Sequence, residues 1–139
     1  MSIDLTTDFG KRALEQLHNE QIIWLTTVSK SVTPEPNPVW FDYVDGDIFI
    51  YTQTTAVRLK NIERNNRVSL NLETDESGER VTVLTGTATI DETFPKSVDN
   101  ARYLQKYAQG IANLGWTAER MSNDFPIVMR ITPDKLRGW

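Results

Sequence analysis

The spacing of apolar residues along the chain changes from helical to alternating near residue 20. Before that point a helix is predicted from roughly Thr6 to Asn19, where Thr7 or Asp8 can cap its start. Its apolar positions are Phe9, Ala13, Leu14 and Leu17. From Gln21 the run QIIWLTTVS is typical of a strand. The proline-rich segment 33–38 that follows predicts a stiff loop.

The clearest local pattern is a hairpin between residues 39 and 53. Two runs rich in β-branched and aromatic residues, VWFDYV and DIFIYTQ, flank a turn at Asp45, Gly46 and Asp47. Thr54 or Thr55 then caps a predicted helix that runs through about Asn65. The candidate buried residues of this helix are Val57, Leu59 and Ile62.

The second half of the chain predicts two strands, a helix and a last strand. RVSLNLET alternates, with Val68, Leu70 and Leu72 on one face, and a turn at 75–78 leads into RVTVLTGTATID. A helix is predicted from Phe94 to about Ala112, and PIVMRIT is typical of a final strand. The predicted order of elements is therefore α-β-β-β-α-β-β-α-β.

This order favours a mainly β fold with helices (α+β). Six strands with mainly hairpin connections indicate an antiparallel sheet closed into a barrel, with the helices packed outside. No linker or repeat divides residues 1–139, so we expect one domain. A small barrel fills its interior with side chains, so a ligand would bind at a rim, in an outer groove or at a subunit interface.

Composition removes several kinds of chemistry. The 139 residues carry a net charge of −4, with no cysteine and one histidine, His18. Disulfides, thiol nucleophiles and a two-histidine metal site within one chain are therefore excluded, and no metal site is expected. The excess of acidic residues argues against sequence-independent nucleic-acid binding. No signal peptide or membrane-spanning run is found, so we expect a cytoplasmic protein.

A basic segment interrupts this acidic chain between Arg58 and Arg67, where four basic residues and one acidic residue give a charge of +3. It follows a hydroxyl-rich turn, at a helix start that would attract anions. Arg58 and Lys60 are two positions apart, so both reach one phosphate only if Arg58 lies in or before the first turn. Lys60, Arg64 and Arg67 share a helical spacing. A phosphate site and a solvated basic face both remain open.

Aromatic residues are concentrated in the hairpin, at Trp40, Phe41, Tyr43, Phe49 and Tyr51. Alternation places most of them in a core, and the other face of the hairpin needs cover from a helix, a partner subunit or a flat ring compound. Trp24, Trp116 and Trp139 are candidates for covering the barrel ends or a dimer interface. We expect His18 at the surface.

The ordered motifs PxPNPVWFDY, YTxTxxxRxKNIxRNxRV, LxGxA and a closing RGW resemble the flavin and deazaflavin oxidoreductase superfamily. The resemblance implies the FMN-binding split barrel of pyridoxamine 5′-phosphate oxidase, and it extends from about residue 7 to the end of the chain. The sequence is most similar to short proteins classed as probable coenzyme F-420-dependent enzymes. It lacks the C-terminal arginine and histidine pattern of pyridoxamine 5′-phosphate oxidase itself, so vitamin B6 oxidation is not the first expectation.

The resemblance also implies a homodimer with a cofactor groove between its protomers. Arg58 and Lys60, with Asn61, would hold the cofactor phosphate. The residues that would line its ribityl chain and ring are Pro38, Val39, Trp40, Phe41, Tyr51, Thr52, Gln53 and Thr54. Trp139 would approach the site across the dimer.

Hydride transfer by such a cofactor needs no protein nucleophile and no metal, which suits this composition. We therefore expect a reductase that uses coenzyme F-420 and an unsaturated small molecule, with the proton drawn from solvent or from Tyr51. No catalytic residue is assigned. The alternatives are an FMN-dependent, pyridoxamine 5′-phosphate oxidase-like oxidoreductase and a non-catalytic flavin- or haem-binding protein.

Overall fold

The computed structural model describes residues 3–139. Its elements are α1 (Asp8–Asn19), β1 (Ile23–Val28), β2 (Pro34–Val39), β3 (Asp42–Val44), β4 (Asp47–Thr52), α2 (Val57–Arg64), β5 (Arg67–Asn71), β6 (Thr82–Ile90), the 3₁₀ turn η1 (Ser97–Asp99), α3 (Ala101–Asn113), α4 (Ala118–Asp124) and β7 (Ile127–Gly138). No helix in this described part is long and apolar enough to cross a membrane.

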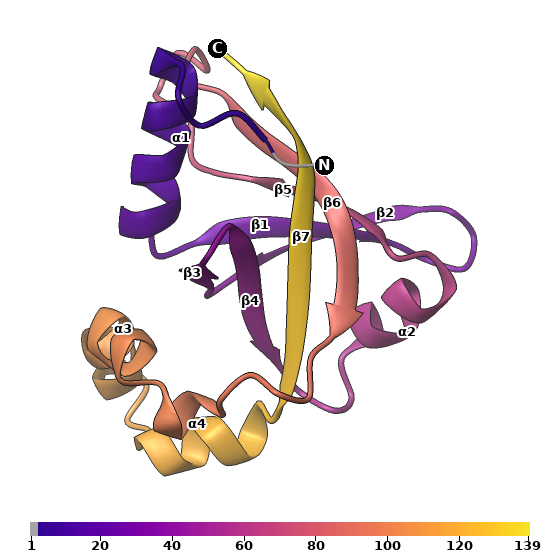
Figure 1. Cartoon of the computed structure of the whole chain (residues 1–139). Helices are drawn as coiled ribbons and strands as arrows, with labels where there is room; N and C mark the ends of the chain where they lie inside the picture. Colours follow the sequence, from indigo (N-terminus) through magenta and orange to yellow (C-terminus); the bar gives the residue numbers. More distant parts are fainter. Residues whose placement is uncertain (1–2) are drawn as a thin grey trace.

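All seven strands belong to one antiparallel sheet with the order β2-β1-β5-β6-β7-β4-β3. Figure 1 shows β1 and β2 crossing β7 and β4 steeply, so the sheet curls around its inner face. Within residues 3–139, the edge strands β2 and β3 do not pair with each other. The mainly β fold with outer helices is confirmed, but the sheet is a seven-stranded half-barrel and not a closed barrel of six strands.

The strand that was not predicted is β2, which is formed by the proline-rich segment predicted as a stiff loop. In β2, Pro34, Pro36 and Pro38 lie opposite Val28, Thr26 and Trp24 of β1. Because alternate residues of a strand point the same way, the three ring nitrogens lie on the open edge, and the residues between them are left to bond β1. Prolines at every second position are therefore compatible with an edge strand.

The first predicted run of the hairpin is split, because Val39 ends β2 and β3 begins at Asp42. Thr7 caps α1 as predicted, by accepting a hydrogen bond from the backbone of Gly10 at 2.9 Å. By contrast, neither Thr54 nor Thr55 caps α2. Its N-cap is Ala56, whose N–H is held by the carbonyl of Gln53 in a preceding turn.

The burial of α2 differs from the prediction at one position. Ile62 is buried, but Val57 in the first turn is 64% exposed. The alternation in β5 is confirmed, since Val68 and Leu70, together with Leu72 just beyond the strand, are all buried. The helix predicted from Phe94 is shorter and begins at Ala101 after η1, while α4 was not predicted and β7 extends to Gly138.

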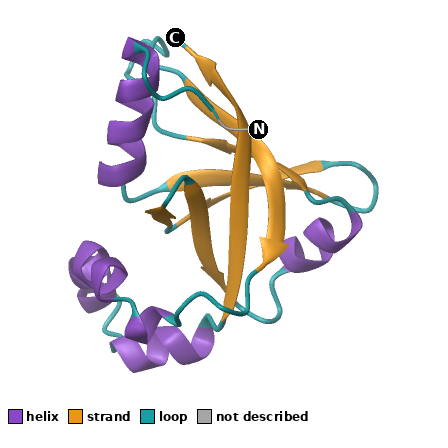
Figure 2. Cartoon of the chain, viewed as in Figure 1, coloured by secondary structure: helices purple, strands orange, loops and turns teal. Residues whose placement is uncertain are grey.

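Two hydrophobic clusters form the core, one on each face of β4. The inner cluster contains Phe41, Ile48 and Ile50 with residues of β1, β5 and β6. The outer cluster contains Phe49 and Tyr51 and is covered by side chains of α3 and α4. Figure 2 shows these helices at the same end of the sheet. Helices of the same chain therefore cover the second face of the hairpin.

Candidate functional site

A cavity of about 280 Å³ lies where the helices α3 and α4 meet the end of the sheet. Its lining is mostly apolar and aromatic, and consists of Ile22, Pro38, Val39, Trp40, Tyr51, Arg58, Tyr103, Leu114, Trp116, Met121 and Phe125. Five of the eleven residues predicted to bind a cofactor are in this set: Pro38, Val39, Trp40, Tyr51 and Arg58. The helical wall was not predicted, and Trp116 is predicted only as a residue that covers a barrel end or a dimer interface.

Arg58 is the only charged residue in the lining of this cavity. Its side chain is half-buried, and burial lowers the pKa of the guanidinium below its ordinary value. Within residues 3–139 its buried Nε has no hydrogen-bond partner. A buried donor without a partner is unfavourable, and an anion bound here would satisfy both the donor and the charge.

Trp40 is held in the cavity wall by α3. Its ring stacks on Tyr107 with the centroids 4.5 Å apart and the planes at 5°. The ring also lies over Gly110, where an added Cβ would come within 2.9 Å of Trp40 Cζ2. Glycine at this helical position therefore allows the close approach that fixes Trp40.

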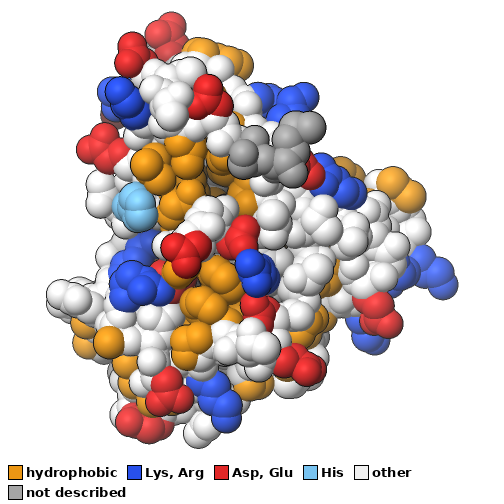
Figure 3. Space-filling view, viewed as in Figure 1, with side chains coloured by type: hydrophobic (Ala, Val, Ile, Leu, Met, Phe, Trp, Pro, Cys, Tyr) orange, Lys and Arg blue, Asp and Glu red, His pale blue; other side chains and the backbone are white. Residues whose placement is uncertain are grey.

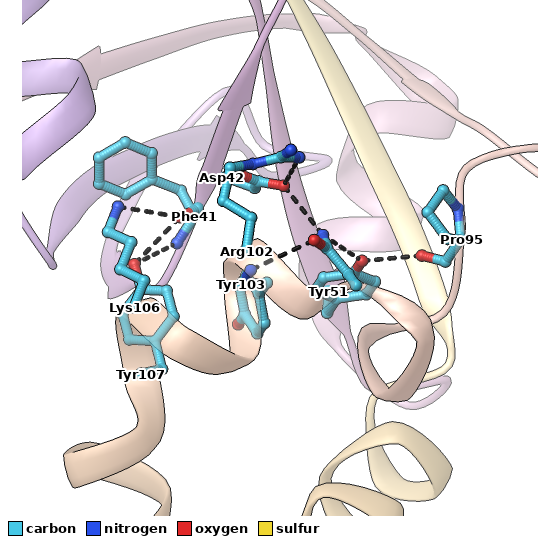
Figure 4. A network of polar contacts seen from close by, with 9 residues as sticks. Phe41, Asp42, Tyr51, Pro95, Arg102, Tyr103, Lys106 and Tyr107 are labelled. Atoms are coloured by element: carbon cyan, nitrogen blue, oxygen red, sulfur yellow. Dashed lines mark hydrogen bonds and ion pairs between the residues drawn. The ribbon is translucent and has the colours of Figure 1, made fainter.

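The Tyr51 ring lines the cavity, and its hydroxyl is held in a polar network behind it (Figure 4). The hydroxyl donates to the carbonyl of Pro95 at 2.7 Å and accepts a hydrogen bond from Asn100 at 3.2 Å. Burial, the largest effect, raises the pKa of Tyr51 to about 12. The hydroxyl proton is therefore engaged in a hydrogen bond to a backbone carbonyl and is not directed into the cavity.

Asn100 connects this tyrosine to the ion pair between the buried Asp42 and the exposed Arg102. Its amide also donates to Asp42 at 2.9 Å, and Asp42 receives two hydrogen bonds from Arg102, at 3.1 and 2.8 Å. Burial of Asp42 acts to raise its pKa, but the hydrogen bonds from Arg102 and Asn100 bring the pKa below its ordinary value. No local pattern predicts this network, because Asn100 and Arg102 are far along the chain from Asp42 and Tyr51.

The other predicted phosphate ligands lie away from the cavity. Lys60 is exposed and lines a separate cavity with Leu59 and Ile62. Asn61 is buried and donates to Thr27 at 2.9 Å and to Glu35 at 2.8 Å, so it anchors α2 to β1 and β2. Their roles toward a cofactor stay predictions.

The remaining predicted ligands are divided between core and surface. Phe41 and Thr52 are fully buried, and no partner for the Thr52 hydroxyl is found in the described part of the chain. Gln53 and Thr54 are exposed. Trp139 is 64% exposed, and its place across a dimer also stays a prediction.

The predicted helical spacing of Arg67 with Lys60 and Arg64 is wrong. The helix α2 ends at Arg64, and Arg67 begins β5, where its side chain donates to Asp134 at 3.0 Å. The backbone N–H of Arg67 is held by the Asn65 side chain at 3.1 Å, in the turn that ends the helix. The basic segment therefore does not form one continuous helical face.

The sequence profile of the pyridoxamine 5′-phosphate oxidase family matches residues 9–139. The chain belongs to this family. A comparison with curated proteins found no match. Membership agrees with the resemblance to flavin and deazaflavin oxidoreductases, and it leaves the activity of this family member open.

Solved structures share the fold at low sequence identity. A conserved hypothetical protein from Mycobacterium tuberculosis is 20% identical, with a TM-score of 0.75 over 98% of this chain and 86% of its own. An F420 reductase is 18% identical, with a TM-score of 0.66 over 88% and 94%. The heme storage protein from Vibrio cholerae is 20% identical, with a TM-score of 0.62 over 92% and 93%. The fold of the pyridoxamine 5′-phosphate oxidase family thus occurs in proteins of different function.

Proposed function

We propose that the protein is an oxidoreductase that binds coenzyme F-420 at this cavity and transfers a hydride between the cofactor and an unsaturated small molecule. The observation that carries the proposal is the convergence of Arg58 with Trp40 and Tyr51 on one cavity. A cation with an unpaired donor beside flat aromatic walls is complementary to a ligand that has an anionic group and a planar ring.

The size of the cavity supports a site completed by a second protomer. Ligand cavities commonly measure roughly 300–1,000 Å³, so a cavity of about 280 Å³ encloses only part of a cofactor. Ile22 and Leu114 in its lining are 41% and 52% exposed, and Trp24 nearby in the sequence is 41% exposed. A homodimer would cover these apolar side chains and enlarge the site.

Each protein group in the proposed mechanism has a limited task. A bound flavin or deazaflavin supplies the hydride chemistry. Arg58 binds an anionic group, and Trp40 and Trp116 exclude water from the cavity. Because the Tyr51 hydroxyl donates to the Pro95 carbonyl, the proton for the substrate comes from solvent.

FMN in the same site is the alternative within the oxidoreductases, since Arg58 would also bind its phosphate. A haem-binding role is less well supported. The single histidine, His18, lines a different cavity, so the proposed site offers no histidine ligand to haem iron.

The decisive experiment is titration of the purified protein with F-420 and with FMN, followed by fluorescence or calorimetry. We expect F-420 to bind more tightly, and Arg58→Ala to weaken its binding by at least about tenfold, as expected for a lost charge-assisted hydrogen bond. Arg80→Ala, at an exposed position, is the matched control. Binding of FMN alone would favour the alternative cofactor, and binding of neither would refute the proposal.

Binding alone does not distinguish an enzyme from a carrier. The reduced cofactor is therefore mixed with the protein and a panel of quinones and enones, and its oxidation is followed optically. Oxidation that depends on both protein and acceptor is expected for a reductase. Tight binding without turnover of any acceptor would indicate a carrier.

A further inference from the structure

A second cavity, of about 240 Å³, lies between α1, β3 and α3 and shares no lining residue with the first. Its lining includes Lys106 and Arg102 from α3, Asp42 and Tyr43 from β3, and His18 from α1. In Figure 3 the histidine lies beside a group of Lys and Arg side chains, next to a hollow with apolar walls. This cavity therefore brings an amine, a guanidinium and an imidazole together.

Lys106 is the half-buried amine of this cavity. Its Nζ lies 3.8 Å from the centroid of the Phe41 ring and donates to the Phe41 carbonyl at 3.2 Å (Figure 4). That carbonyl already accepts a hydrogen bond from Tyr107 at 3.0 Å. Within the described residues Nζ makes no ion pair, so its charge is stabilised mainly by a neutral carbonyl and a ring.

The carboxylate in the cavity is already engaged by other groups. Asp42 receives hydrogen bonds from Arg102 and Asn100, and this pairing occupies Nε and Nη2 of Arg102. Nη1 of Arg102 donates no hydrogen bond within residues 3–139, and the Arg102 side chain is 59% exposed. A small anion entering the cavity would find Nη1 and His18 at its rim.

We propose that Lys106 is a carbonyl-reactive amine and that this cavity takes a small aldehyde or 2-oxo acid that carries a carboxylate. The unprotonated Nζ adds to the carbonyl carbon and forms the C–N bond. The carbonyl oxygen takes up protons and leaves as one water molecule, which gives an imine. No oxidant or reductant is required, and hydrolysis returns the free lysine.

The electrostatic surroundings agree with this role. Burial lowers the pKa of Lys106 to about 8, against the opposing effects of Asp42 and Glu20. The other titratable groups around it are His18 from α1, Tyr43 from β3, and Arg102 and Tyr107 from α3. At pH 7.5 a lysine with this pKa has an unprotonated fraction roughly two orders of magnitude above that of an ordinary lysine.

Reductive trapping of the whole protein tests the proposal. Glyoxylate and cyanoborohydride are added at pH 7.5, and the carboxymethylated lysines are mapped by peptide mass spectrometry. The chain provides its own comparison set: Lys11, Lys30, Lys60, Lys96 and Lys135. We expect Lys106 to react at least about tenfold faster than the median of these five. The α-amino group, which also forms imines with aldehydes, is mapped separately. Equal labelling, or slower labelling of Lys106, would overturn the proposal.

Two further measurements separate the amine from the anion site. Lys106→Arg keeps the charge and should abolish the rapid phase of labelling, while Lys30→Arg, at an exposed lysine, should leave it intact. Acetaldehyde, a small probe without a carboxylate, should show at least about threefold lower selectivity for Lys106, in line with one lost hydrogen bond to a charged group. Equal selectivity for both probes would overturn the carboxylate part. If Lys106→Arg does not fold, the mapping of the unmodified chain still decides the question.

Discussion

Gly110→Ala should destabilise the protein, although alanine normally stabilises a helix. The added Cβ would lie 2.9 Å from Cζ2 and 3.0 Å from Cη2 of Trp40. Carbon atoms prefer a separation of about 3.5–4.0 Å, so the ring has to move by roughly 0.6 Å. Tyr107 stacks against this ring and restricts its movement. Overpacking of this kind costs ~1–3 kcal/mol, and the gain in helix propensity is ~0.5–1 kcal/mol. We expect a net loss of about 1 kcal/mol.

Urea unfolding and thermal unfolding, followed by far-UV circular dichroism, measure this change. A loss of about 1 kcal/mol corresponds to a decrease in Tm of roughly 3 °C for a chain of this size. Ala108→Gly, at an exposed position of α3, measures the propensity effect without a contact to Trp40. In a Trp40→Ala background the sign should reverse, and Gly110→Ala should then stabilise the protein by ~0.5–1 kcal/mol. Stabilisation by Gly110→Ala in the unmodified chain would refute this account of how Trp40 is positioned.

Three further substitutions test the polar contacts around the site. Tyr51→Phe removes the hydroxyl that donates to Pro95 and should lower the unfolding free energy by about 1 kcal/mol. Under the proposed function the rate of hydride transfer stays within about twofold of the unmodified protein. A decrease in this rate of about 100-fold would make Tyr51 the proton donor. Asp42→Asn should cost ~1–3 kcal/mol at neutral pH because Arg102 loses its partner. The pKa of Asp42 is lower in the folded than in the unfolded protein, so ionised Asp42 stabilises the fold above its unfolded pKa, and this stabilisation is lost as the pH falls through the folded pKa. Asp42→Asn should therefore flatten the acid side of a stability–pH profile. An unchanged profile would contradict the assignment. Asn61→Ala leaves the hydroxyl of Thr27 and the carboxylate of Glu35 without their donor and should cost ~2–3 kcal/mol in urea unfolding, with a loss below about 0.5 kcal/mol arguing against an anchoring role.

Elements with signals in adjacent residues could be predicted from the sequence. Thr7 caps α1 through a bond to a residue three positions away, and the alternation of Val68, Leu70 and Leu72 reports a buried face directly. The proline segment predicts a loop but forms β2, because a proline fits a strand when its ring nitrogen lies on the side that has no neighbouring strand. That information belongs to the arrangement of the sheet.

The candidate site could be predicted only in part for a similar reason. Helical spacing allows Arg58 and Lys60 to reach one phosphate only if Arg58 lies in or before the first turn. Arg58 does lie in the first turn of α2, but the two residues line different cavities. The helical wall at Trp116 and Met121, and the ion pair of Asp42 with Arg102, depend on how α3 and α4 pack on the sheet. No local pattern encodes contacts between residues about 60 or more positions apart.

The prolines of β2 also limit how copies of this protein can associate. A strand added at that edge would meet backbone carbonyls but no N–H groups at Pro34, Pro36 and Pro38, so it could form only about half of the usual ladder. The opposite edge, β3, has only three residues. Growth of the sheet from one molecule into the next is therefore disfavoured at both ends. Association is left to side-chain surfaces, which favours closed assemblies of defined size over open polymers.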